Sequence, residues 1–166
     1  MTALILIVCG LAMLFGVVVF FGAPYLPTLK PQVAAAFTLL DLHKGQTLLE
    51  LGSGDGRVLL EAAKRGYNAV GIELNLALVL IALWRTRYYR KQVRVIWGNY
   101  WLKPWPVSDG VFTFLINNFM PKLDSHMQKY GGGLASVAFK IPGKQPVKEL
   151  DGVYLYKYDK KLASTE

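Results

Sequence analysis

The sequence predicts an α/β domain built on a mostly parallel sheet, preceded by one N-terminal transmembrane helix. Three observations support this fold class. Residues 3–22 form an unbroken apolar run, apolar runs of strand length alternate with segments of helical period from residue 33 onward, and a glycine-rich bend directly follows the first expected strand. Strands that alternate with helical segments are typical of βαβ units, and therefore of a parallel sheet.

The apolar run at residues 3–22 has the length of a membrane span. Thirteen of its twenty residues are Leu, Ile, Val or Phe, and a helix that rises about 1.5 Å per residue crosses a hydrocarbon core of about 30 Å in twenty residues. A cleaved signal peptide is the alternative. No basic segment precedes the run and no A-x-A-like site precedes Pro24, so an uncleaved anchor is favoured.

The charges that flank this run predict its orientation. The first 29 residues contain no Lys, Arg, Asp or Glu, whereas Lys30 and Lys44 follow the run. By the positive-inside rule, the C-terminal domain is expected on the cytoplasmic side of the membrane. The net charge of +8 suits a domain held beside anionic lipid, so the basic character does not require a nucleic-acid partner.

Three segments follow from these patterns: a transmembrane anchor at residues 1–22, a proline-rich linker at 23–31 and a compact domain at 32–166. In the domain, strands are expected at 47–51, 69–73, 93–97, 111–116, 134–141 and 153–158, and helices over 33–40, 57–65, 76–90 and 121–130. Six strands make a shortened sheet. The apolar run at 76–84 is too short to cross a membrane, so we expect a helix buried against the sheet.

The segment that indicates chemistry is Glu50-Leu51-Gly52-Ser53-Gly54-Asp55-Gly56, at the end of the first expected strand. Glycines at alternate positions permit a tight bend and let a ligand contact the backbone, while the next helix begins with free N–H groups. The second strand then ends at Glu73, where a carboxylate can accept hydrogen bonds from both hydroxyls of an adenosine ribose. The expected site is the crevice at the carboxyl edge of the sheet.

The spacing of these glycines favours one cofactor over another. A dinucleotide fingerprint reads G-x-G-x-x-G, whereas this loop reads G-x-G-x-G after an acid, as in class I methyltransferases. S-adenosylmethionine has no pyrophosphate, but it has an ammonium group and a sulfonium centre. Both favour the negative charge that Glu50 and Asp55 supply, so S-adenosylmethionine is the expected cofactor.

Three words of the sequence together resemble one family: A-P-Y-L-P-T at residues 23–28, L-G-S-G-D-G-R at 51–57 and G-I-E-L-N at 71–75. The chain is similar to the membrane-anchored protein-lysine methyltransferases that modify the c-subunit of ATP synthase and the adenine nucleotide translocase, and to their small bacterial relatives. The resemblance implies a Rossmann-like class I methyltransferase sheet after one transmembrane helix. It also implies a protein substrate, with membrane proteins among the candidates.

The resemblance also implies a set of cofactor-binding residues, with Tyr25 near the mouth of the site. These residues are Thr28, Glu50, Gly52, Ser53, Gly54, Asp55, Gly56, Glu73 and Asn99. The chain departs from the family where Glu50 replaces Asp, Leu76 replaces Pro and Asn99 replaces an acid that contacts the adenine amine. An amide oxygen can still accept that hydrogen bond.

Methyl transfer from a sulfonium is an in-line displacement, which requires mainly alignment and the exclusion of water. For a lysine substrate, topology suggests acceptors at Asn117 and Asn118 after the fourth strand, or at Tyr100 and Asp109 in the preceding loop. A catalytic metal is not expected, because the two histidines lie far apart and show no ligand spacing.

Other substrates and roles stay open at this point. The segment N-N-F-M-P at residues 117–121 lacks the Asn or Asp, Pro-Pro and aromatic pattern that nucleobase amino methyltransferases use, so nucleic acid ranks below protein as a partner. A quinone or lipid head group is the alternative substrate. A scaffold that binds S-adenosylmethionine without transferring its methyl group is the third hypothesis.

Overall fold

The computed structural model describes residues 1, 2, 5, 10 and 26–159. Nearly all of the expected anchor at residues 3–22, and the first residues of the linker, lie outside this described part. Among the residues that are described, no helix is both long and apolar enough to cross a membrane.

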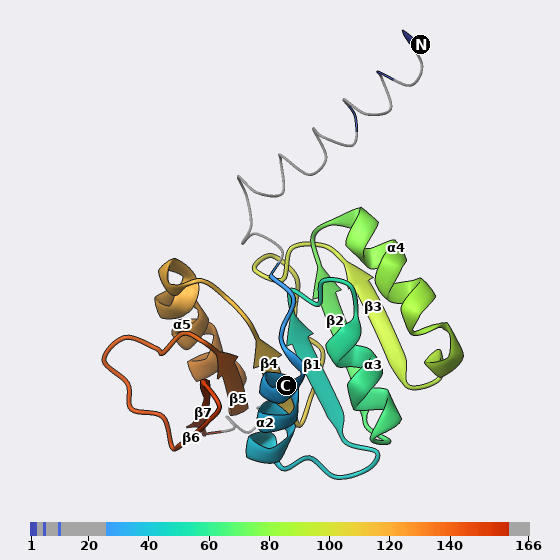
Figure 1. Ribbon diagram of the computed structural model, residues 1–166. Helices are drawn as coiled ribbons and strands as arrows, with labels where there is room; N and C mark the ends of the chain where they lie inside the picture. Colours follow the sequence, from blue (N-terminus) through green and yellow to red (C-terminus); the bar gives the residue numbers. More distant parts are fainter. Residues whose placement is uncertain (3–4, 6–9, 11–25, 160–166) are drawn as a thin grey trace, which may run out of the picture.

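The domain contains a seven-stranded sheet in the order β3-β2-β1-β4-β5-β7-β6 (Figure 1). Strands β1 to β5 run parallel, whereas β7 is antiparallel to β5 and to β6. The strands are β1 (Thr47–Leu51), β2 (Asn68–Glu73), β3 (Val93–Trp97), β4 (Gly110–Thr113), β5 (Gly132–Val137), β6 (Lys148–Leu150) and β7 (Val153–Tyr158). The strand order reverses direction at β1 and β4, and in open α/β sheets ligands bind at the carboxyl ends of the strands at such a point.

The prediction of a shortened sheet with about six strands was wrong. The missed strand, β6, has three exposed residues, Lys148–Leu150, and pairs with β7 alone. Two expected strands are also shorter than predicted, because β4 ends at Thr113 and β5 ends at Val137.

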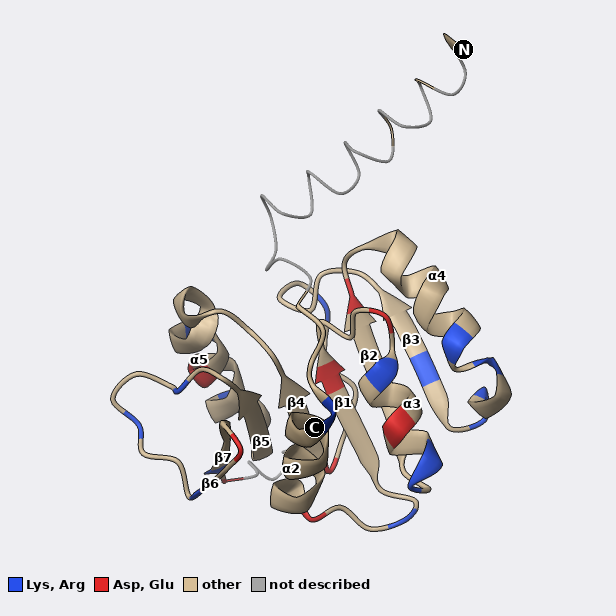
Figure 2. Cartoon of the chain, in the orientation of Figure 1, with Lys and Arg blue, Asp and Glu red and all other residues tan. Residues whose placement is uncertain are grey.

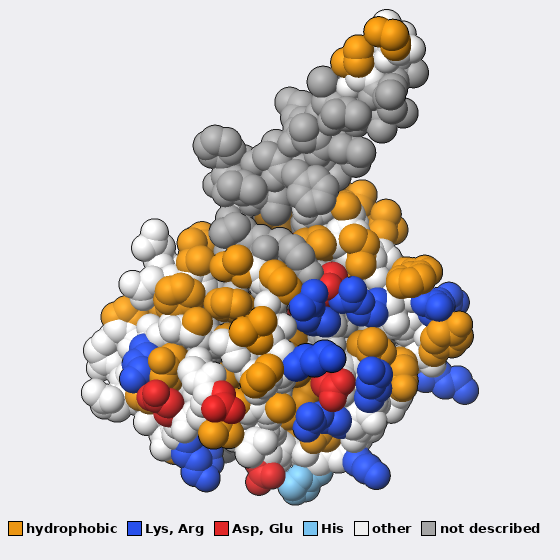
Figure 3. All heavy atoms as spheres, viewed as in Figure 1, with side chains coloured by type: hydrophobic (Ala, Val, Ile, Leu, Met, Phe, Trp, Pro, Cys, Tyr) orange, Lys and Arg blue, Asp and Glu red, His pale blue; other side chains and the backbone are white. Residues whose placement is uncertain are grey.

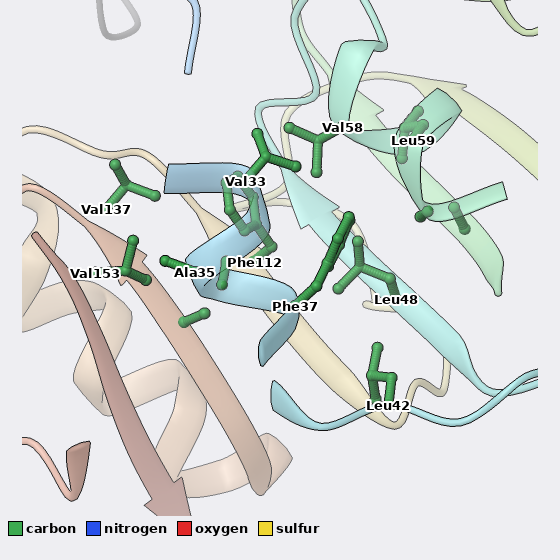
Figure 4. Close-up of a cluster of buried hydrophobic side chains, with 14 residues drawn as sticks. Val33, Ala35, Phe37, Leu42, Leu48, Val58, Leu59, Phe112, Val137 and Val153 are labelled. Carbon is green, nitrogen blue, oxygen red and sulfur yellow. The ribbon is translucent and has the colours of Figure 1, made fainter. Parts of the chain in front are cut away.

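Within residues 26–159, four α-helices cover the sheet: α2 (Lys30–Leu40), α3 (Arg57–Lys64), α4 (Leu76–Arg85) and α5 (Met120–Tyr130). Helices α2 and α3 bury side chains such as Phe37 and Leu59 against one face, in a cluster that includes Leu48 of β1 (Figure 4). Helix α5 buries Leu123 and Met127 against the opposite face. Helix α4 packs against β2, β3 and α3.

Two helix predictions need correction. Pro31 was assigned to the linker, but it lies in the first turn of α2. Proline is tolerated there because a backbone N–H in the first turn has no acceptor within the helix. The helix expected over residues 76–90 ends at Arg85, and a 3-10 turn, η1 (Arg87–Tyr89), follows it.

The expected burial of residues 76–84 holds for one side of α4 only. Leu78, Val79 and Ala82 are buried, whereas Leu80 is 59% and Trp84 is 65% exposed. The outer side of α4 is therefore apolar and uncovered within the described part of the chain.

Candidate cofactor and active site

The glycine-rich bend lies where expected, between β1 and α3. The backbone N–H groups of Gly52 and Ser53 both donate to the carbonyl of Ile72 in β2, at 2.9 and 3.2 Å. The N–H of Gly56 donates back to the carbonyl of Ser53 at 2.9 Å. These bonds fix the bend at the carboxyl edge of the sheet, where acidic segments end both β1 and β2 (Figure 2).

Gly56 is required by both backbone geometry and packing. Its φ is +76°, which side chains rarely adopt, and a Cβ there would lie 2.8 Å from the Cβ of Ala82 in α4. Gly56 therefore lets α3 begin in close contact with α4.

Glu73 ties the bend to the end of β2. Its two carboxylate oxygens accept one hydrogen bond each, from the N–H of Gly54 and from the N–H of Asn75, both at 2.8 Å. The side chain of Asn75 in turn caps α4 by accepting from the N–H of Ala77 at 2.9 Å. Because a carboxylate has about four acceptor sites, Glu73 keeps the capacity to accept further hydrogen bonds from a ligand.

The side chain of Glu50 is buried and has one unsatisfied hydrogen-bond acceptor. The residue is 4% exposed, and within residues 26–159 its Oε2 atom, like the hydroxyl of Ser53, has no hydrogen-bond partner. Burial raises the pKa of Glu50 well above its usual value, and the negative charges of Glu73 and Asp55 raise it further. A buried carboxylate oxygen without a partner is costly, so the site is suited to a cationic donor.

Asp55 differs from the role expected of it. Its carboxylate contacts the guanidinium of Arg57 at 2.9 Å and also pairs with Arg85 of α4. The charge of Asp55 is therefore largely offset by two arginines, and its geometry supports joining α3 to α4. Glu50 and Glu73 are left as the acids predicted to bind the cofactor.

Asn99 and Tyr100 lie in the loop after β3. The side-chain oxygen of Asn99 accepts from the N–H of Trp101 at 2.9 Å, so it stabilises the loop and has limited capacity for an adenine amine. Tyr100 lies over the glycine bend, since its Cε1 would be 4.0 Å from a Cβ on Gly52. Burial and then the charge of Glu73 raise the pKa of Tyr100, which keeps the phenol protonated and disfavours it as a base.

The remaining candidates divide between the two edges of the sheet. Asn117 and Asn118 are exposed in a 3-10 turn, η2 (Asn117–Phe119), after β4, and Thr28 is buried just before α2. These three lie toward the carboxyl edge. Asp109 was a wrong choice as an acceptor, because it accepts from the N–H of Thr47, the first residue of β1, at 2.8 Å. Asp109 therefore lies at the amino edge.

Two supporting residues were missed by sequence reasoning, Asn75 and Arg85. The helix-capping pattern of Asn75 before an apolar run was a usable signal. Arg85 had no local signal, because its contact with Asp55 depends on how α4 packs beside α3. Tyr25, expected near the mouth of the site, lies outside the described residues.

The strand order and the acid-rimmed glycine bend define a Rossmann-like class I methyltransferase domain. Comparison with known families agrees: residues 50–148 match the family described as the ANTKMT methyltransferase domain. The chain belongs to this family, and the class of cofactor that such domains use is S-adenosylmethionine.

Among curated proteins, the chain is 32% identical to the lysine N-methyltransferase of the ATP synthase c-subunit from Rattus norvegicus, over 72% of this chain and 56% of that protein. It is 30% identical to a protein-lysine N-methyltransferase of Saccharolobus islandicus, over 80% of this chain and 92% of that protein. The chain spans about half the length of the animal relatives it matches.

Among solved structures, the fold resembles an RNA methyltransferase of Salinibacter ruber in complex with S-adenosyl-L-homocysteine. The TM-score is 0.75 and the identity 25%, over 84% of this chain and 98% of that one. A methyltransferase of Thiobacillus denitrificans in complex with the same compound has a TM-score of 0.54 at 22% identity, over 72% of this chain and 54% of that chain, and shows the shared fold alone.

Proposed function

We propose that this chain is an S-adenosylmethionine-dependent protein-lysine N-methyltransferase that is anchored in a membrane by residues 3–22 and acts on a membrane protein. The observation that carries the proposal is the unpartnered oxygen of Glu50, buried beside the glycine bend. The lysine specificity is supported by the names of the relatives. The anchor is supported by the apolar run, and the cytoplasmic placement by Lys30 and Lys44.

The residues present fit S-adenosylmethionine, which supplies an electrophilic methyl group when bound. Glu50 and the hydroxyl of Ser53 would accept hydrogen bonds from its ammonium group, because both have unmet acceptors there. Glu73 would accept from the ribose hydroxyls with its remaining lone pairs. Tyr100 lies over Gly52 and would exclude water from this part of the bend.

At the acceptor side, Asn117 and Asn118 follow β4, the neighbour of β1 in the sheet. The oxygens of their backbone carbonyl groups and side-chain amides would orient a neutral lysine amine for in-line attack. Alignment of this kind contributes a large part of the rate acceleration of such a reaction. The proton would leave the lysine ammonium to water before transfer, since the phenol of Tyr100 is held protonated.

The test uses the purified full-length chain, methyl-labelled S-adenosylmethionine and membranes from cells that lack the gene. Label in a membrane protein, located on lysine by mass spectrometry, supports the proposal. Glu73→Gln serves as the matched control, since it keeps the shape of the carboxyl group and removes its charge. Label confined to an organic extract would indicate a quinone or lipid substrate, and binding without any transfer would indicate a scaffold.

RNA is the competing substrate, because an RNA methyltransferase is among the similar structures. The same labelling reaction decides between them when it is repeated after nuclease or protease treatment. Loss of the label with protease and its retention after nuclease are the expected results. The opposite pattern would overturn the choice of a protein substrate.

A further inference from the structure

The outer side of helix α4 is apolar, which is unusual for a helix that faces water. Nine of its ten residues, LALVLIALWR, are apolar, and Arg85 is the last. Leu76, Leu80, Leu83 and Trp84 are exposed at positions i, i+4, i+7 and i+8, which form one stripe along a helix. We call the exposed side chains of these four residues and Tyr88, which is 81% exposed, the α4 surface.

Basic residues continue from the C-terminal end of the α4 surface. The guanidinium of Arg87 lies 4.4 Å from the ring centres of both Trp84 and Tyr88. Arg90 and Lys91 follow and are exposed. Within residues 26–159, Arg87, Arg90 and Lys91 form no salt bridge with a carboxylate. Apolar side chains gather over α4 on the face shown in Figure 3, with basic side chains beside them.

We propose that the α4 surface is a membrane-docking surface that inserts its leucines and Trp84 into an anionic bilayer while Arg87, Arg90 and Lys91 contact the lipid phosphates. Leucine and tryptophan beside arginine and lysine are the composition of helices that lie in a membrane interface. Each basic group near an anionic leaflet adds to the attraction. A second copy of the chain would explain the apolar stripe but not the positive charge beside it.

The position of the expected anchor also supports a membrane as the partner of the α4 surface. This step of the inference rests on the proposed function. If residues 3–22 span the bilayer, the four peptide steps from Gly22 to Leu26 reach at most about 14 Å. Leu26 precedes α2 at the carboxyl edge of the sheet, and α4 begins at Leu76 on the same edge, after β2. In that case the membrane lies on the side of the N-terminal end of α4, and the helix, which is about 15 Å long, has to lie along the bilayer for Arg87, Arg90 and Lys91 at its other end to contact the lipid as well.

Docking in this way would hold the cofactor crevice close to the lipid interface. Trp97 ends β3 at the carboxyl edge and Leu102 lies in the next loop, and these two residues are 57% and 83% exposed. An enzyme oriented like this reaches a lysine at the end of a transmembrane segment more readily than one in open solution.

The test is a fluorescent probe on the full-length chain in a Cys9→Ser background. An environment-sensitive fluorophore is attached to Leu80→Cys, or to Lys148→Cys as the matched control, since Lys148 is exposed on β6 at the far end of the sheet. The chain is reconstituted into vesicles of phosphatidylglycerol and phosphatidylcholine that contain a lipid with a quencher in its acyl chain.

Several-fold stronger quenching by the lipid at position 80 than at position 148 is the expected result. Adding Arg90→Glu and Lys91→Glu should reduce that quenching at least twofold, and so should vesicles of phosphatidylcholine alone. Equal quenching at the two positions would overturn the proposal. So would a blue shift at position 80 without lipid quenching, which would indicate cover by a second copy or by residues 1–25, and so would protection of the probe by RNA without vesicles.

Cofactor binding by the same labelled proteins, measured by calorimetry, separates this inference from the proposed function. Loss of lipid quenching with intact binding of S-adenosylmethionine would contradict the docking proposal but leave the proposed function standing. Absence of binding with intact lipid quenching would contradict the proposed function but leave the docking proposal standing.

Discussion

At the scale of single residues, Glu50 carries a conflict between stability and binding. Its carboxyl group is buried beside Glu73 and Asp55, and one oxygen has no hydrogen-bond partner among the described residues. Ionised Glu50 therefore destabilises the empty site, whereas a bound ammonium group would relieve that cost. Sequence reasoning identified Glu50 from the acid before the glycines, but the missing partner became visible only in three dimensions.

Replacing Glu50 by Gln should raise the stability of the free protein. Because the folded pKa of Glu50 is raised, its favourable contribution is complete below the unfolded pKa of about 4.3 and is lost as pH rises through the folded pKa. Above that range Glu50→Gln should melt higher than the wild type, by about 2–4 °C for each 1 kcal/mol gained. Thermal melts from pH 4 to pH 8 measure this; an equal difference at every pH would show that ionisation of Glu50 is not the cause.

The same substitution should weaken the binding of S-adenosylmethionine. Removing the charged partner of an ammonium group costs about 1.5–3 kcal/mol, which is about a tenfold to hundredfold rise in Kd. Wild-type affinity for S-adenosylmethionine should also increase with pH as Glu50 ionises, whereas Glu50→Gln should show a flatter profile. Titrations in a pH series test both effects, and parallel profiles would exclude Glu50 as the ammonium acceptor.

Gly56 gives a residue-scale test of the packing between α3 and α4. Gly56→Ala should destabilise the fold by about 2–4 kcal/mol, because it adds a clash with Ala82 to the strain of a positive φ. Gly143→Ala is the control, since its φ is +72° but nothing lies within 4 Å of a Cβ there. It should cost about 1 kcal/mol. Urea unfolding compares them, and equal costs would contradict the close approach of α4.

At the scale of elements, the strands were predictable where apolar runs had clear limits. Strands β1, β3 and β7 have the predicted bounds. Strand β6 could not be predicted, because three exposed residues without an apolar pattern form a strand only when β7 lies beside them. The outer side of α4 was missed for a related reason, since an apolar run on its own does not show which of its faces is covered.

Helix α5 is tied to β7 through Asp124. The Asp124 carboxylate accepts from the hydroxyl of Tyr158 at 2.6 Å and from the ammonium of Lys144 at 3.0 Å. Partial burial alone would raise the pKa of Asp124, but the hydrogen bonds from Tyr158, Lys144 and Gln128 outweigh it and lower this pKa. The group joins three elements on the face of the sheet opposite α2.

Asp124→Asn should therefore destabilise the protein by about 1–2 kcal/mol, a value reduced by the partial exposure of the group to solvent. Because the folded pKa is lowered, the contribution is present above the unfolded pKa of about 3.9 and is lost as pH falls through the folded pKa. Urea unfolding at pH 7 and at pH 3 checks the sign. A larger difference between the variant and the wild type at pH 3 would contradict it.

At the scale of the whole molecule, the fold class and the mostly parallel sheet followed from the alternation of elements, and the acid-glycine bend lies after β1, where the sequence predicts it. What did not follow were contacts between segments far apart in sequence. The pairing of Asp55 with Arg85 and the position of Asp109 at the amino edge depend on packing and strand direction. Glu50 and Glu73 therefore stay the acids predicted to bind the cofactor, whereas Asp55 pairs with two arginines.

The most direct measurement is a calorimetric titration of S-adenosylmethionine into the purified full-length chain and into Glu73→Ala. Binding at one site per chain is expected for the wild type, with at least a tenfold loss of affinity in the variant. The loss should arise because Glu73 both accepts from the ligand and holds Gly54 and Asn75 in place. No heat with the wild type, or the same Kd for both proteins, would contradict the account.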